Sequence, residues 1–139
     1  MTALSKNFHL QEFACKCGCE TEFVVDSKLV LILQAIRDEV GPLRITSGHR
    51  CPGHNKASGG SKRSFHLLRK NKLYAADIQP LDPTRKTLEH CKTIYILADK
   101  LDAGGVGLYP TWCHVDTRSV NIFAGNERAR WIAATVELT

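Results

Sequence analysis

The chain has 139 residues, of which 43% are hydrophobic, and its formal net charge at pH 7 is +5. This size predicts a single domain over residues 1–139, with residues 1–22 as a cysteine-rich N-terminal arm. No window approaches the roughly 20 apolar residues of a membrane span, and residues 1–11 lack a secretory pattern, so we expect a protein made in the cytoplasm without a signal peptide and without membrane insertion. The positive charge favours anionic partners, although it is equally typical of a soluble basic surface.

The N-terminal arm is polar and irregular, and a strong helix pattern follows it. Phe8 and Phe13 are the apolar residues that we expect to dock the arm onto the rest of the molecule. Asp26 is a good helix cap, and apolar residues then recur at three- and four-residue steps as far as Val40. Gly41, which precedes a proline, should end this helix.

Two strands separated by a long loop are predicted next. Residues 43–46 favour a short strand, and residues 51–53 form a turn that opens a loop rich in Gly, Ser and Lys as far as Arg63. Loops of this length in small domains often have a functional role. His49 is expected to be exposed, and residues 74–79 favour a second strand.

The second half of the chain predicts one more helix and a hairpin. An Asp-Pro pair suits the start of a helix from Pro83 to about Leu101, and a pair of glycines ends it. Residues 106–108 and 112–116 favour a β-hairpin. The tail from Ser119 onward has no clear pattern, with Trp131 as its expected anchor. Because helices and strands do not alternate strictly, the sequence predicts an α+β fold, with a small antiparallel sheet and helices packed on one side.

Two histidines and an aspartate are candidate ligands of a metal ion. His66 follows the glycine-rich loop, Asp77 lies in the second predicted strand, and His114 lies in the last. Catalytic zinc sites use imidazole and carboxylate ligands on rigid elements and keep one position open for water. Alternation along a strand places Asp116 on the same face as His114. The spacing alone is also compatible with a surface histidine, a strand-end carboxylate and a core histidine that bind no metal.

The order of short motifs along the chain supports a family resemblance. The motifs are, in sequence, Asn7-Phe8, Glu12-Phe13, Leu33-Gln34, Ile36-Arg37-Asp38, Ile45-Thr46-Ser47-Gly48-His49-Arg50, Asn55, Gly59-Gly60, Ser64-Phe65-His66, Ala76-Asp77-Ile78, Gly107-Leu108-Tyr109-Pro110 and His114-Val115-Asp116-Thr117-Arg118. Over residues 7–131 the chain resembles the zinc D-Ala-D-Ala carboxypeptidase and L-alanyl-D-glutamate endopeptidase family of bacteria and phages, whose fold is shared with the hedgehog signalling domain.

The resemblance implies a zinc metallopeptidase that hydrolyses peptidoglycan stem peptides, either as a D,D-carboxypeptidase or as an endopeptidase. It implies that His66, Asp77 and His114 hold zinc, and that Arg50 faces the substrate. Ser64, two residues before His66, is a candidate substrate contact, and bracing of the loop is its alternative role. A phage or prophage endolysin that acts at the bacterial cell wall after release would fit this activity. The expected partner is a peptidoglycan peptide and not nucleic acid, and a monomer is expected. The alternative is a zinc-bearing module that binds cell wall or protein and has lost the chemistry.

The spacing of the first two implied ligands departs from the family pattern. Ten residues separate His66 from Asp77, and the family usually has a shorter spacer. Residues 69–72 are therefore interpreted as an insertion in the turn that joins the two ligand-bearing segments. A surface turn can lengthen at a small cost in free energy without moving the elements that it joins.

The catalytic base is the second departure from the family pattern. Several relatives have an acidic residue three positions before the last histidine, and here that position is Thr111. Asp116 is the substitute candidate for the catalytic base. Its alternative role is structural, as an aspartate that orients His114 or pairs with Arg118.

Four of the six cysteines lie in the arm or beside the predicted substrate loop: Cys15, Cys17, Cys19 and Cys51. They are compatible with a second, structural zinc site or with one disulfide that ties the arm to the body. Because Cys-x-Cys-x-Cys lacks the usual zinc-knuckle spacing, a single tie between the arm and Cys51 is favoured. Cys91 and Cys113 are expected to be ordinary buried thiols.

Overall fold

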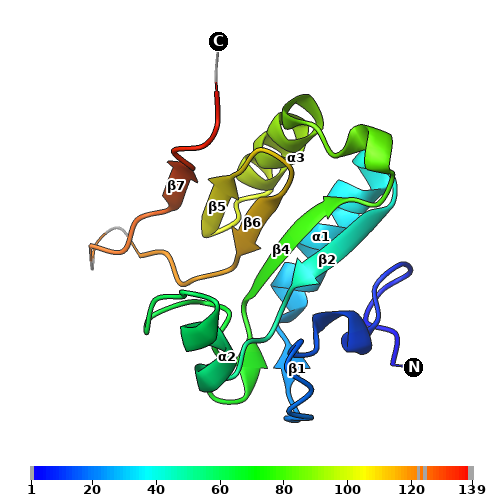
Figure 1. Cartoon of the computed structure of the whole chain (residues 1–139). Helices are drawn as coiled ribbons and strands as arrows, with labels where there is room; N and C mark the ends of the chain where they lie inside the picture. Colours follow the sequence, from blue (N-terminus) through cyan, green and yellow to red (C-terminus); the bar gives the residue numbers. More distant parts are fainter. Residues whose placement is uncertain (1, 122, 124, 138–139) are drawn as a thin grey trace.

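A five-stranded sheet forms the centre of the molecule, in the strand order β2-β4-β6-β5-β7 (Figure 1). The computed structural model describes residues 2–121, 123 and 125–137. The strands are β2 (Leu43–Ser47), β4 (Ala75–Pro80), β5 (Gly105–Leu108), β6 (Cys113–Asp116) and β7 (Ala129–Ile132). The first four strands in this list pair antiparallel, whereas β7 runs parallel to β5. The sheet is therefore mixed, because the tail adds a parallel edge strand to the predicted antiparallel set.

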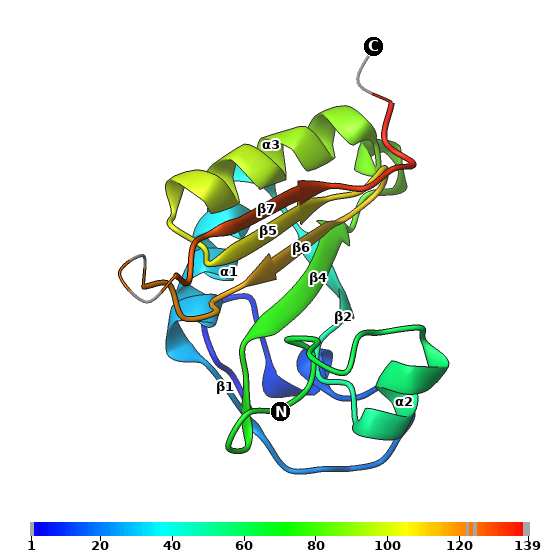
Figure 2. The same cartoon turned by 90° about the vertical axis from the view of Figure 1, so that its left-hand side faces the viewer.

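Two helices, α1 (Ser27–Val40) and α3 (Leu88–Lys100), pack along one face of this sheet (Figure 2). Cys113 of β6 faces them, since its Sγ donates a hydrogen bond to the backbone oxygen of Cys91 on α3. Both thiols are fully buried, as predicted. The α+β class with helices on one side is thereby confirmed, and alternation along β6 directs His114 to the opposite face.

The helix α1 matches the expectation from its periodicity. The Asp26 carboxylate accepts a hydrogen bond from the backbone N–H of Leu29 and caps the first turn. Gly41 ends the helix with a φ of 91°, a left-handed conformation that glycine adopts without a steric penalty. The buried residues of α1 form its inward-facing apolar stripe: Leu29, Val30, Ile32, Leu33 and Ile36. No helix among the described residues is long and apolar enough to cross a bilayer.

Two of the predicted boundaries are wrong. The expected turn at residues 51–53 begins a short helix, α2 (Pro52–Ala57), because the Cys51 sulfur caps the backbone N–H of His54 and proline suits a first helical turn. The helix expected from residue 83 starts later. Residues Pro83–Arg85 form only a 3₁₀ turn, and α3 begins at Leu88 after its cap, Thr87.

The N-terminal arm packs under the end of β2, as its two phenylalanines predict. Phe8 and Phe13 are 1% and 0% exposed, and Phe13 ends a 3₁₀ helix, η1 (Leu10–Phe13). The backbone N–H of His49 donates to the backbone oxygen of Phe13. The prediction that His49 is exposed is wrong: its side chain is buried against Phe23, with a ring-centroid distance of 5.2 Å.

The close approach of the arm to Gly48 gives a stability prediction. A Cβ atom at Gly48 would lie 2.6 Å from the backbone oxygen of Phe13 and 2.8 Å from its Cα. Backbone atoms cannot swing aside, so Gly48→Ala is expected to lower the free energy of unfolding by about 1–3 kcal/mol. The matched control is Gly53→Ala, because a Cβ there meets nothing within 4 Å. Thermal unfolding curves that coincide for the two variants would contradict this close packing of Phe13 on Gly48.

Candidate metal centre

His66, Asp77 and His114 converge on the sheet face opposite the helices. Asp77 on β4 and His114 on β6 are direct cross-strand partners, and His66 arrives from the loop that precedes β3 (Lys72–Leu73). The Oδ1 atom of Asp77 lies 3.2 Å from Nε2 of His66 and 3.0 Å from Nδ1 of His114. All three side chains are buried, at 4%, 4% and 8% exposure.

Each imidazole is oriented by a hydrogen bond from its other ring nitrogen. Nδ1 of His66 donates to the backbone oxygen of Gly48 at 2.7 Å, and Nε2 of His114 donates to Oδ2 of Asp116 at 2.7 Å. These bonds leave Nε2 of His66 and Nδ1 of His114 directed toward Asp77. In metal-ligating histidines, the ring nitrogen that does not bind the metal usually has such a hydrogen-bond partner, because that bond fixes the tautomer and the ring orientation.

The donor atoms fit a tetrahedral zinc ion. The three ligand atoms lie within 4.8 Å of one another, and the two closest pairs are 3.0 and 3.2 Å apart. Ligand bonds of about 2.0–2.1 Å in a tetrahedron place neighbouring ligand atoms about 3.3 Å apart. Two imidazoles and one carboxylate also match the ligand types of catalytic zinc sites, which use three protein ligands.

The charges around Asp77 suit a cation as well. Burial alone raises the pKa of Asp77, but hydrogen bonds with His114 and His66 outweigh it and lower the pKa to about 2. Burial lowers the pKa of His114, and its bonds with Asp116 and Asp77 more than reverse this, so that the net pKa is raised. The site thus keeps an ionised carboxylate between two imidazoles, where a divalent cation can replace bound protons.

Asp116 lies behind His114 rather than at the open side of the centre. Its side chain is fully buried, and Oδ2 accepts from His114 and from Nη2 of Arg118 at 2.6 Å. Oδ1 accepts from the backbone N–H and Nε of Arg118, at 3.0 and 2.9 Å. Burial raises the pKa of Asp116, but the bonds with His114 and Arg118 hold it well below its usual range. The sequence left two roles open for Asp116. These contacts favour the orientation of His114 and not the role of catalytic base.

Arg50 and Ser64, the two expected substrate contacts, both border the centre. Arg50 donates through Nη2 to Oδ2 of Asp77 at 3.4 Å and through Nε to Ser47 at 3.1 Å. Ser64 accepts from the backbone N–H of His66 at 3.2 Å and so braces the ligand loop. Both also line a cavity of about 550 Å³ over the centre.

Asn55 is a buried residue of α2 whose role the sequence did not predict. It is 3% exposed, and its amide donates to the backbone oxygen of Ser61 at 2.8 Å. Its carbonyl oxygen accepts from Nη1 of Arg50 at 3.5 Å. Asn55 therefore links the loop after α2 to the arginine at the metal centre.

An aromatic wall beside His114 was also missed. Tyr109 and Trp112 stack with ring centroids 3.6 Å apart, and Trp131 donates from Nε1 to the Tyr109 hydroxyl at 3.1 Å. The Trp131 ring lies 5.1 Å from that of His114. A Cβ at Gly107 would collide with Trp131, so glycine is required there for the indole to reach the site. The sequence indicated Trp131 only as an anchor for the tail.

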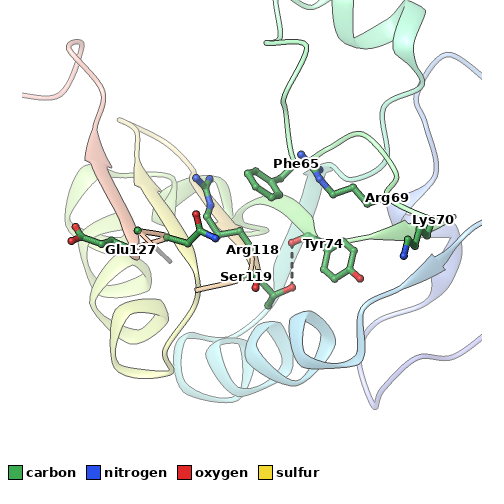
Figure 3. A pocket seen from close by; sticks show the side chains of 10 residues that line it. Phe65, Arg69, Lys70, Tyr74, Arg118, Ser119 and Glu127 are labelled. Carbon is green, nitrogen blue, oxygen red and sulfur yellow. Dashed lines mark hydrogen bonds between the residues drawn. The ribbon is translucent and has the colours of Figure 1, made fainter. Parts of the chain in front are cut away.

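A second, larger cavity of about 920 Å³ shares part of its lining with the cavity over the centre (Figure 3). Phe65 and Arg118 line both cavities. The Phe65 ring lies between two guanidinium groups, with Arg69 at 3.9 Å and Arg118 at 4.3 Å from its centroid. Lys70, Tyr74 and the carboxylate-bearing Glu127 also line this cavity, so its cations outnumber its carboxylate. The approach to the centre is thus cationic and aromatic.

Residues 69–72, interpreted from the sequence as an insertion, form a tight turn. Lys70 and Asn71 have positive φ values of 50° and 66°, and Arg69 and Lys72 exchange two backbone hydrogen bonds of 2.9 and 3.0 Å. Two central residues with φ above zero are typical of a two-residue hairpin turn that matches the strand twist. These residues are therefore accommodated locally, and His66 still reaches Asp77.

A protein-family model matches most of the chain. The family model described as Peptidase M15 matches residues 6–116, from the N-terminal arm to the end of β6. This range includes all three converging residues, whereas Arg118 and Trp131 lie beyond it. No curated protein is significantly similar to the chain. Because the match covers most of the chain and the converging residues are of the types that hold zinc in such peptidases, the chain belongs to the peptidase M15 family.

Proposed function

We propose that this protein is a zinc-dependent peptidase that hydrolyses peptidoglycan stem peptides, with zinc held by His66, Asp77 and His114. The observation that supports this most directly is the pair of oriented imidazoles, whose free nitrogens lie 3.2 and 3.0 Å from one oxygen of Asp77. Membership of the M15 family supports peptidase activity. A phage or prophage lysin that reaches the cell wall after release fits this activity.

The residues around the centre have separable roles in this proposal. Zinc, when bound, lowers the pKa of water to about 7 and polarises a peptide carbonyl. The Gly48 carbonyl and the Asp116 carboxylate hold the two imidazoles in the ligating orientation. Tyr109, Trp112 and Trp131 line one cavity with the proposed ligands, and a substrate packed on these rings would displace water and strengthen electrostatic interactions at the centre.

The charge of the lining favours an anionic peptide. Arg50, Arg63 and Arg118 line the cavity over the centre, and Arg69 and Lys70 outnumber Glu127 in the lining of the adjoining one. A stem peptide has free carboxylates, which arginine binds through two parallel hydrogen bonds. The two cavities share Phe65 and Arg118, so a peptide bound at the centre could extend into the adjoining cavity, which suits cleavage within a stem as well as removal of its last residue.

The test is digestion of isolated peptidoglycan, followed by mass spectrometry of the soluble products. Release of free D-alanine would identify a carboxypeptidase, and shortened or split stems would identify an endopeptidase. An apoprotein prepared with a chelator should be inactive, and added zinc should restore the activity. Zinc bound at the centre without any released product would overturn the peptidase proposal.

A second candidate function is a zinc-bearing module that binds the cell wall without cutting it. Among the described residues that line the cavity over the centre, Asp77 is the only carboxylate, and it is a proposed ligand. Thr111 occupies the position that is acidic in relatives, and Asp116 is fully engaged with His114 and Arg118. Cosedimentation with intact peptidoglycan, without product release, would favour this candidate.

Arg50→Lys tests the substrate role of that arginine. Lysine keeps the charge but loses the planar fork, so we expect kcat/KM to fall about 10- to 100-fold, the equivalent of one or two charged hydrogen bonds. Most of the loss should appear in KM, with zinc content unchanged. The control is Arg44→Lys, an exposed arginine on β2. Loss of zinc in Arg50→Lys would instead show that Arg50 acts by holding Asp77.

A further inference from the structure

Four cysteine sulfurs gather at a place that the peptidase mechanism does not use. Cys15, Cys17 and Cys19 belong to the N-terminal arm, and Cys51 is the cap of α2. All four Sγ atoms lie within 4.8 Å of one another. The Cys17 sulfur is 3.2 Å from that of Cys15 and 3.5 Å from that of Cys51. The cluster thus brings together sulfur atoms from segments more than thirty residues apart in the sequence.

The mutual distances fit one tetrahedral ion with four thiolate ligands. Zinc–sulfur bonds of about 2.3 Å in a tetrahedron place neighbouring sulfurs about 3.8 Å apart, which lies between the shortest distances and the outer limit found here. The four thiols are free in the structure. A single disulfide would use two of them and would give no reason for the other two to lie within the same 4.8 Å limit.

Backbone and hydroxyl groups already contact three of these sulfurs. The N–H of Cys51 donates to the Cys15 sulfur at 3.4 Å, and the N–H of His54 donates to the Cys51 sulfur at 3.4 Å. The Cys19 sulfur lies 3.3 Å from the Thr21 hydroxyl. Hydrogen bonds to an ionised sulfur stabilise it, and bonds of this kind orient a ligand before the ion binds.

We propose that Cys15, Cys17, Cys19 and Cys51 bind a structural zinc ion. Thiolates are soft ligands that select zinc, and four protein ligands leave no position for a reacting water. The ion would tie the arm to the residue that follows Arg50. The arm also bonds the backbone of His49, next to the Gly48 carbonyl that orients His66. The second ion therefore fixes the loop on which the peptidase centre depends.

Metal content separates this site from the peptidase centre. The wild-type protein should contain two zinc ions per chain, and His66→Ala should retain one. Adding Cys17→Ser and Cys51→Ser to His66→Ala should remove the remaining ion, whereas adding Cys91→Ala, a change at a buried thiol outside the cluster, should not. If His66→Ala still contains two ions and the cysteine changes remove one, the peptidase centre fails while this proposal stands.

Cobalt substitution tests the proposal without any cysteine variant. The test therefore remains valid if the cysteine variants fail to fold. His66→Ala loaded with cobalt should show the strong thiolate-to-metal charge-transfer absorption of a tetrahedral sulfur site. Absence of that absorption would overturn the proposal. A native protein mass that is two hydrogens short, with only two of the four thiols open to alkylation, would also overturn it in favour of a disulfide.

Discussion

Replacing His66 with alanine is expected to lower the rate of hydrolysis of peptidoglycan peptides by at least about 10³-fold. Loss of only the hydrogen-bond partner that orients a ligand histidine typically lowers metal affinity or activity 10- to 100-fold, so loss of the ligand itself should cost more. The variant loses one of three proposed ligands, and the remaining donors, Asp77 and His114, cannot hold zinc at the strength of three. Product release from isolated peptidoglycan and zinc content per chain are the measurements.

The control for His66→Ala is a histidine of similar chemistry outside the centre. His90 is exposed at the start of α3, where its ring contacts only the capping Thr87 hydroxyl among the interactions described. His90→Ala should keep both zinc content and hydrolysis within a factor of about two, since surface changes are usually small. Hydrolysis by His66→Ala at the wild-type rate would contradict the proposed centre, whatever its zinc content.

Elements with local causes were predictable from the sequence. The helix α1 follows from a capping aspartate, an apolar period and Gly41, all within one stretch of chain. The β5–β6 hairpin follows from two short apolar runs around Tyr109 and Pro110. The converging residues were identified from the order of motifs along the chain, since spacing alone left non-metal interpretations open. The interpretation of residues 69–72 as an insertion rests on the length of the spacer between His66 and Asp77 and stays a prediction.

Features that depend on distant contacts were not predictable. Strand β7 pairs in parallel with β5, and such pairing has no turn motif between the partners to indicate it. Trp131 was therefore placed as an anchor, although it reaches the ring of His114 only because Gly107 leaves space. His49 is buried since the N-terminal arm packs over it, a contact between segments far apart in sequence.

Replacing Asp116 with asparagine is expected to weaken zinc binding at the centre 10- to 100-fold, the usual cost of losing the partner that orients a ligand histidine. Asparagine keeps the size of the side chain but offers one acceptor oxygen, which cannot serve both His114 and Arg118 as the carboxylate does. The free energy of unfolding should also fall by on the order of 1–3 kcal/mol, because a buried hydrogen-bond donor is left unsatisfied. Competition with a chelator measures the zinc affinity, and kcat is measured at saturating zinc.

The two roles considered for Asp116 predict different changes in zinc affinity and in kcat. An orienting residue lowers zinc affinity and leaves most of kcat in the zinc-saturated enzyme, whereas a catalytic base lowers kcat by about 10²- to 10⁴-fold with zinc affinity intact. The matched control is Asp99→Asn, which breaks another aspartate–arginine pair, with Arg130, where the aspartate is exposed. That change should cost about 0–1 kcal/mol and leave zinc affinity unaltered. A loss of kcat alone in Asp116→Asn would restore the base role and would mean that the carboxylate leaves Arg118 during the reaction.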